Sequence, residues 1–237
     1  MRQYFKLALL VCLSLAILLV ANSAMARKGI YVGLGSSGLS IKDGPDGKTY
    51  LVDDVTNPTL VYNQYAMESS SGLGYFLGWG IHRFISVEYQ ASSNTGKAAF
   101  TSSGIKTEKD ATMDIAMGDV RLNLPLGQRF EVYVLGGMTQ GVATIKDAAA
   151  KGSSSGGIGG FTASQTTASQ YKGTGQTTGF GMEFFMNRMG IGLSQNVHSL
   201  SYNSLTGVGT SSEIKPAIKT EITQTLLTIS YNFMGTK

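Results

Sequence analysis

Large apolar residues return at every second position over much of this 237-residue chain. In the clearest stretch, Leu73, Tyr75, Leu77, Trp79 and Ile81 alternate with glycine or phenylalanine. A period of two sends successive side chains to opposite faces of a β-strand, so one face of this strand is apolar. This feature argues against a helical fold and predicts an all-β protein.

The same alternation predicts eight strands in all. In the segment 130–138, odd-numbered and even-numbered positions both carry apolar residues. The sequence therefore does not show which face of that strand is apolar. No segment between the strands has a helical period. The predicted strands cover residues 29–41, 70–81, 85–96, 110–124, 130–146, 175–186, 189–199 and 218–233.

The connections between these strands alternate in length. Those at 82–84, 125–129 and 187–188 are short. The other connections, such as 42–69 and 147–174, are long and rich in small and polar residues. Short turns at one rim and long loops at the other are typical of an up-and-down antiparallel barrel of the bacterial outer membrane.

Composition excludes several classes of function. Cys12 is the only cysteine and there are two histidines, so we expect neither a disulfide framework nor a metal site. A formal charge of +4 is too weak for a nucleic-acid interface, and no phosphate-binding motif precedes a helix, so we expect no nucleic-acid partner and no cofactor. Charged residues make up only 14% of the chain, which is little solvating charge for a soluble protein.

The N-terminal 26 residues resemble a secretory signal peptide. Arg2 and Lys6 precede an apolar run over 7–20, and Ala24 and Ala26 form a small-x-small cleavage site. The run is too short for a comfortable transmembrane helix, although an uncleaved anchor is the alternative. We therefore expect export through the periplasm, cleavage after Ala26, and a single barrel domain over 27–237.

The alternation by itself fits either a soluble barrel with an apolar interior or a membrane barrel with an apolar exterior. The signal peptide, the small polar residues of the second face and the mid-strand charges on that face favour the membrane barrel. Aromatic residues near the predicted strand ends would form the girdles that membrane barrels place at the two interfaces. These interface aromatics are Tyr75, Trp79, Tyr89, Phe184, Tyr231 and Phe233.

Six short segments carry a family resemblance, at 29–35, 86–89, 122–126, 133–138, 179–184 and 230–233. Together they resemble the OmpA/OmpX-type small outer-membrane barrels. The resemblance implies a location in the bacterial outer membrane and a closing segment, with Tyr231 and Phe233, that the barrel assembly machinery reads. Four residues follow Phe233, which departs from the family pattern. We expect no counterpart of the family's optional peptidoglycan-binding domain.

One group of charges is predicted to lie in the lumen. Glu88, Arg121 and Glu183 each lie about four residues from a short turn, and Asp119 shares the face of Arg121. An eight-stranded barrel is just wide enough for side chains to fill it, so these groups must pair inside it. The family resemblance implies a salt-bridge network that obstructs the lumen, and a gate for a narrow pore is the alternative.

An enzyme is an alternative because the sequence contains His198, Ser201 and Glu213, and a PagL-type lipid A deacylase uses a serine, a histidine and a glutamate. The spacing between His198 and Ser201 puts their side chains on opposite faces of a strand, so we predict a protein that is not an enzyme.

We expect activity in the long loops, as adhesion or ligand binding, or else structural support of the membrane. Expected partners are outer-membrane lipids, lipopolysaccharide and a surface or host ligand, while a narrow porin-like channel remains the alternative.

Overall fold

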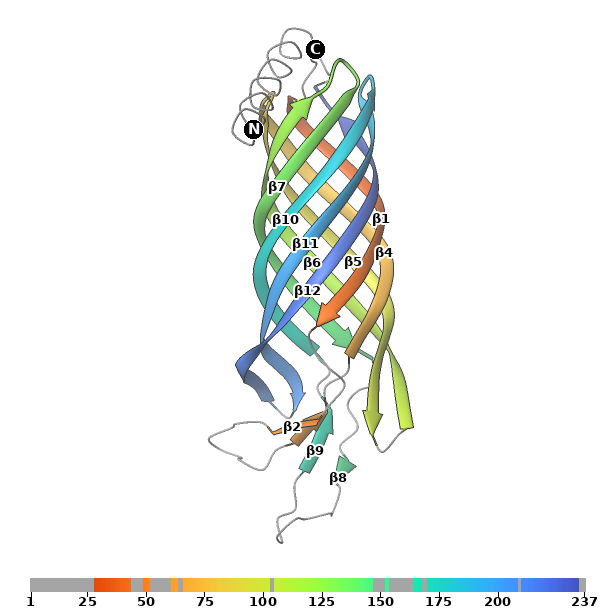
Figure 1. Cartoon of the computed structure of the whole chain (residues 1–237), viewed down its shortest axis with the longest axis vertical. Helices are drawn as coiled ribbons and strands as arrows, with labels where there is room; N and C mark the ends of the chain where they lie inside the picture. Colours follow the sequence, from red (N-terminus) through yellow and green to blue (C-terminus); the bar gives the residue numbers. More distant parts are fainter. Residues whose placement is uncertain are drawn as a thin grey trace, which may run out of the picture.

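The computed structural model describes residues 28–43, 49–51, 61–63, 66–102, 105–146, 152–153, 164–167, 170–208 and 210–234. Within them, eight antiparallel strands close into a barrel, which confirms the predicted architecture (Figure 1). Strand β12 closes the ring by pairing with β1. No described helix is long and apolar enough to cross a membrane. The barrel strands are β1 (Gly29–Asp43), β4 (Ala66–His82), β5 (Ile85–Ser102), β6 (Ile105–Pro125), β7 (Phe130–Ile145), β10 (Gln170–Met186), β11 (Met189–Val208) and β12 (Thr210–Asn232).

A second, small sheet lies outside the barrel. Its strand order is β2 (Thr49–Leu51), β3 (Val61–Asn63), β9 (Ser164–Thr167) and β8 (Gly152–Ser153). The central pair, β3 and β9, is parallel. Because β2 and β3 belong to the connection after β1, and β8 and β9 to the connection after β7, this sheet joins two long loops at one end of the barrel (Figure 1). We call this the loop end and the opposite end the short-turn end.

Several predicted strand ends are wrong. The expected loop at 97–109 is a hairpin in which β5 continues to Ser102 and β6 begins at Ile105. The expected loop at 200–217 is likewise a hairpin of β11 and β12. Two of the four outward connections are therefore extended β-structure. These ends are wrong because the apolar residues on the outward face of each strand stop before the strand itself ends.

The structure assigns the faces of β7, which the sequence left open. Glu131, Leu135 and Thr139 are buried inside the barrel, whereas Val134 and Met138 are exposed on its outer wall. The register explains this, because Leu135 is the cross-strand partner of Arg121 and directly opposed residues share a face of the sheet. The odd-numbered residues of β7 therefore line the lumen.

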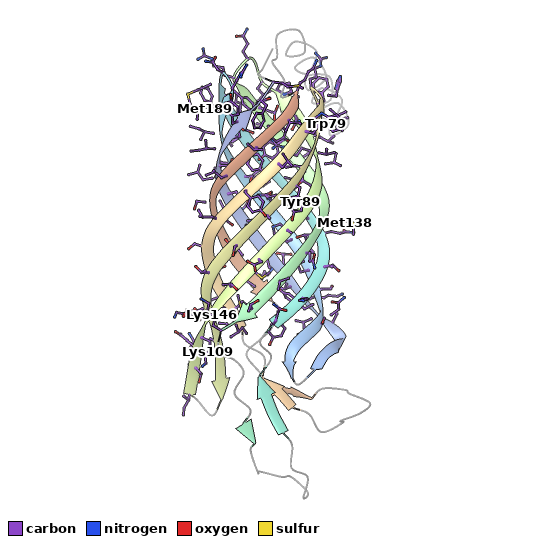
Figure 2. The ribbon with its side chains drawn as sticks, turned by 180° about the vertical axis from the view of Figure 1, so that it is seen from behind. Trp79, Tyr89, Lys109, Met138, Lys146 and Met189 are labelled. Carbon is purple, nitrogen blue, oxygen red and sulfur yellow. The ribbon has the colours of Figure 1, made fainter. Side chains whose placement is uncertain are left out.

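The outer wall of the short-turn half is apolar. Trp79 and Met189 project from it near the short turns, and Tyr89 and Met138 project farther along the barrel (Figure 2). Together the exposed side chains form a continuous apolar band around the ring. The band comprises Ile30, Leu34, Leu73, Tyr75, Leu77, Trp79, Ile81, Ile85, Tyr89, Val120, Leu122, Val134, Met138, Phe180, Met182, Phe184, Met189, Ile191, Leu193, Leu227, Ile229, Tyr231 and Phe233.

The loop half reverses this pattern. Its exposed outer wall carries polar side chains, such as Lys97, Gln140 and Glu221, and Lys109 and Lys146 mark its end in Figure 2. Its interior is apolar instead. We call this interior cluster the apolar core, and it consists of Leu39, Met67, Ala98, Ala111, Met113, Ile115, Ala143, Ile145, Tyr171, Leu200, Tyr202 and Ile222.

Candidate functional site in the barrel interior

The interior of the barrel holds three layers of side chains between the short turns and the loops. Nearest the short turns is a charged layer, which contains Glu88, Asp119, Arg121, Glu131 and Glu183. A polar belt follows, made by Ser37, Ser92, Thr177, His198 and Gln224. The apolar core fills the loop half.

Arg121 is the centre of the charged layer. Its Nη1 lies 2.9 Å from Glu88 Oε2, and its Nη2 lies 3.5 Å from Glu131 Oε1 and 3.7 Å from Glu183 Oε2. The guanidinium therefore links strands β5, β7 and β10 through β6. All four side chains are at least 95% buried, so water does not screen these ion pairs as it would at a surface.

Two tyrosines complete the layer. Arg121 Cζ lies 3.5 Å from the centroid of the Tyr133 ring, which is a close cation–π contact. The Tyr133 ring occupies the space beside Gly181, its cross-strand partner, where any Cβ atom would collide with it. Tyr31 lies over Gly78 in the same way and donates a hydrogen bond of 3.1 Å from its hydroxyl to Glu88 Oε2. The glycines thus make room for the aromatic rings that enclose the ion pairs.

Asp119 occupies a different position from the other three predicted lumenal charges. It is buried and is the cross-strand partner of Glu88. Neither of its carboxylate oxygens has a hydrogen-bond partner among the described residues. The structure therefore brings Glu88, Arg121 and Glu183 together in ion pairs and leaves Asp119 beside them without one.

Glu131 is a lumenal charge that the sequence pattern does not reveal, because both faces of β7 carry apolar residues. The signal was the short turn between β6 and β7, which fixes the register and pairs Glu131 with Pro125 on the face that carries Arg121. With Glu131, the layer contains four carboxylates and one guanidinium. Ser230 also joins the layer by donating a hydrogen bond to Glu183 Oε1.

His198 lies at the centre of the polar belt and is fully buried. Its Nε2 lies 3.1 Å from Gln224 Oε1 and its Nδ1 lies 2.7 Å from Thr177 Oγ1. Because Oε1 can only accept, Nε2 donates and Nδ1 accepts from the threonine hydroxyl. The Gln224 amide then donates to Ser37 and Ser92, at 3.0 and 2.8 Å, so the belt crosses the barrel from β10 to β5.

The residues of the enzymatic reading do not form a catalytic set. His198 points into the barrel, while Ser201 lies on the other face of β11, between the buried Leu200 and Tyr202. The side chain of Glu213 lies outside the described residues. Among the described residues, no group of three histidine, cysteine, aspartate or glutamate side chains is arranged to hold a metal ion.

The predicted interface aromatics all project outward from the apolar band. Trp79, Phe184, Tyr231 and Phe233 lie close to the short turns, and the rings of Tyr231 and Phe233 meet edge to face at 5.3 Å. Tyr75 lies in mid-strand, because β4 begins earlier than predicted, whereas Tyr89 lies near the start of β5. The predicted cleavage site at Ala24 and Ala26 lies outside the described residues.

The exposed β5–β6 hairpin carries its own ion pairs. Lys97 pairs with Asp110 across the hairpin, and Lys106 pairs with Glu68 at 3.0 Å and with Glu108 at 2.6 Å. The hydrogen bond from Lys97, with its positive charge, holds the pKa of Asp110 below its ordinary value. The same contact raises the pKa of Lys97.

A family model described as "Outer membrane protein beta-barrel domain" matches residues 8–233. The chain belongs to this family. Its structure is similar to OprG from Pseudomonas aeruginosa, with 11% identity, a TM-score of 0.52, and coverage of 89% of this chain and 98% of that one. It is also similar to Ail of Yersinia pestis, solved with a heparin analogue, with 13% identity, a TM-score of 0.45, and coverage of 86% and 98%. No curated protein matches the sequence.

This protein therefore lies in the bacterial outer membrane. Its short turns face the periplasm and its loop end faces outward. A membrane-spanning strand needs about 9–11 residues, and β6 and β12 have 21 and 23. The apolar band of the short-turn half matches the bilayer, so the loop half with its polar wall extends beyond the membrane.

Proposed function

We propose that this protein is a non-enzymatic barrel with a closed lumen, which acts through the surface that it presents outside the cell. The observation that carries the proposal is the succession of the charged layer, the polar belt and the apolar core within one narrow barrel. In this proposal the charged layer, with Arg121 and its carboxylates, forms the first part of the obstruction. The orientation of His198 and Ser201 on opposite faces of β11 supports the absence of a nucleophilic mechanism.

The outward surface is better suited to ligand binding than a set of independent loops would be. The small sheet joins the connection after β1 to the connection after β7, and the β5–β6 hairpin stands beside it as ordered structure (Figure 1). Recognition commonly resides on connections that a rigid scaffold positions. Adhesion or binding of a surface ligand is the role we favour, with structural support of the membrane as the remaining role.

Two further partners belong to this proposal. Exposed lysines on the wall of the loop half, such as Lys42, Lys97 and Lys172, would contact lipopolysaccharide phosphates just above the bilayer. The assembly machinery would read the C-terminal segment with Tyr231 and Phe233 during insertion.

A planar-bilayer recording tests the closed lumen. The chain 27–237 is refolded and inserted, and its folding is verified by heat-modifiable electrophoretic mobility. We expect no discrete openings from the unchanged protein and none from Arg121→Ala, because the polar belt and the apolar core still fill the barrel in that variant. Reproducible openings of the unchanged protein would instead support the narrow channel.

A loop deletion tests the outward role separately. Removing residues 147–169 takes away β8 and β9 and hence one half of the small sheet. We expect the barrel to fold and cell or ligand binding to fall to the level of cells that lack the protein. Equal binding by the deletion variant would contradict a role for this surface.

A further inference from the structure

The periplasmic rim of the barrel has a charge pattern of its own. Each of the three short turns contains one arginine, namely Arg83, Arg129 and Arg188. Lys28 precedes β1 at the same rim. The charged side chains described on the outer surface of this end are all cationic. The exposed carboxylates of the described residues lie in the loop half, at Glu68, Glu108, Asp110, Asp114 and Glu221.

The choice of cation also differs between the two ends. Beyond the predicted signal peptide, every arginine except Arg27 and the lumenal Arg121 lies in a short turn, whereas the loop half carries lysines. The guanidinium is a planar fork that binds two oxygens of one phosphate, which the ammonium group of lysine cannot do. The short turns therefore carry the cation best suited to a phosphate group.

An apolar groove lies on the outer wall beside two of these turns, and Phe84 of the first turn lines it. It has a volume of about 640 Å³ and lies over β5, β6, β7 and β10 in the short-turn half. Apolar side chains make up most of its lining, namely Phe84, Ile85, Leu122, Leu124, Val132, Val134, Phe180 and Met182. It faces the bilayer, where an extended hydrocarbon chain is the matching occupant.

The backbone fixes the two arginine turns against strands that line this groove. The carbonyl oxygen of Phe84 accepts a hydrogen bond of 2.9 Å from the Asn123 amide, which holds the Arg83 turn against β6. The carbonyl oxygen of Arg129 accepts one of 2.7 Å from the Phe185 amide, which holds that turn against β10. The Arg83 guanidinium carbon lies 4.5 Å from the centroid of the Phe84 ring, and that ring lines the groove.

We propose that this groove and its two arginines form a binding site for an anionic phospholipid of the periplasmic leaflet. An acyl chain would lie along the groove, and Arg83 and Arg129 would hold the headgroup phosphate. The periplasmic leaflet is the part of the outer membrane that is built from phospholipids, and the site lies at its depth. The pattern of charge matches this ligand, because no exposed carboxylate described at this rim would repel it.

Native mass spectrometry of the refolded barrel tests the site. The protein is equilibrated in detergent with equal amounts of phosphatidylglycerol and phosphatidylcholine that carry the same acyl chains. We expect the first lipid retained to be phosphatidylglycerol in clear excess. Arg83→Gln and Arg129→Gln should each lower this preference by about fivefold, since one cation near an anionic lipid contributes about 1 kcal/mol.

Two further variants separate the site from general charge effects. Lys172→Gln removes one positive charge at the loop end and should leave the preference unchanged. Val134→Phe fills the groove with apolar atoms and should lower lipid retention while both arginines remain. The proposal is overturned if the unchanged protein shows no preference, or if the double arginine variant retains phosphatidylglycerol as the unchanged protein does. Two-copy assemblies that depend on Val134 would also overturn it, because the groove would then be a dimer contact.

Discussion

The two halves of this barrel distribute apolar and polar side chains in opposite ways. The short-turn half has an apolar exterior and a charged interior, while the loop half has a polar exterior and an apolar interior. Each arrangement places apolar side chains away from water, and only the location of the water differs. The same eight strands therefore form a membrane barrel at one end and a barrel of the soluble type at the other.

The comparison also concerns what holds each half together. In the bilayer half, burying an apolar outward side chain in lipid contributes to insertion, and the interior depends on paired charges and hydrogen bonds. In the loop half, tight packing of Met113, Leu200 and Tyr202 replaces the charges. Removing a charged group should therefore destabilise the short-turn half most. Removing side-chain volume should destabilise the loop half most.

The largest effect is expected for Arg121→Met. The variant keeps most of the side-chain volume but leaves buried carboxylates without their counter-charge, which destabilises proteins by about 3–5 kcal/mol. Urea unfolding of the barrel in lipid vesicles measures this loss. Lys219→Met, on the exposed wall of the loop half, is the control and should change stability by less than about 0.5 kcal/mol. Equal stability of the two variants would show that the charged layer does not hold the membrane half.

Leu200→Ala probes the loop half, and we expect it to cost about 3 kcal/mol. Leu200 is 2% exposed in the apolar core, so the substitution removes buried methyl groups and leaves a cavity. The neighbouring Ser201→Ala acts on the outer face and serves as the control. If both variants unfold at the same urea concentration, the apolar core is not a packed core.

A pair of arginine substitutions locates the boundary between the halves. Leu227→Arg places a charge in the apolar band, whereas Thr223→Arg places it four residues farther toward the loops on the same face of β12. We expect Leu227→Arg to cost about 2 kcal/mol more, because arginine is costly within the bilayer and tolerated near its surface. Unfolding in vesicles measures the difference. Equal costs would mean that the bilayer also covers the loop half.

The smallest effect concerns the exposed pair of Lys97 and Asp110. Lys97 lowers the pKa of Asp110, so the contribution of the pair to stability is complete near neutral pH and is lost as the pH falls through the lowered pKa. In Lys97→Met, the titration midpoint of Asp110, followed by NMR, should rise. A midpoint that stays unchanged would show that the pair does not persist in solution.

Much of this architecture follows from the sequence. The alternation of Leu73 to Ile81 predicts a strand with an apolar face, and the short connections predict neighbouring antiparallel strands. The same reasoning places Glu88, Asp119, Arg121 and Glu183 on the inner face, since each has the parity opposite to the apolar residues of its strand. These inferences succeed because a strand has a fixed period of two and the bilayer accepts one kind of side chain.

The rest depends on which strands meet. Along β11, the apolar residues move from odd-numbered positions, such as Ile191 and Leu193, to even-numbered positions, such as Leu200 and Tyr202. In the sequence of one strand, such a change looks the same as the end of the strand. Only the closed ring shows that the inner apolar residues of all eight strands meet in one core. The face of Glu131 was likewise decided by its pairing across β6 and β7. Local sequence determines which positions can share a face, while the partners across the barrel decide what that face contacts.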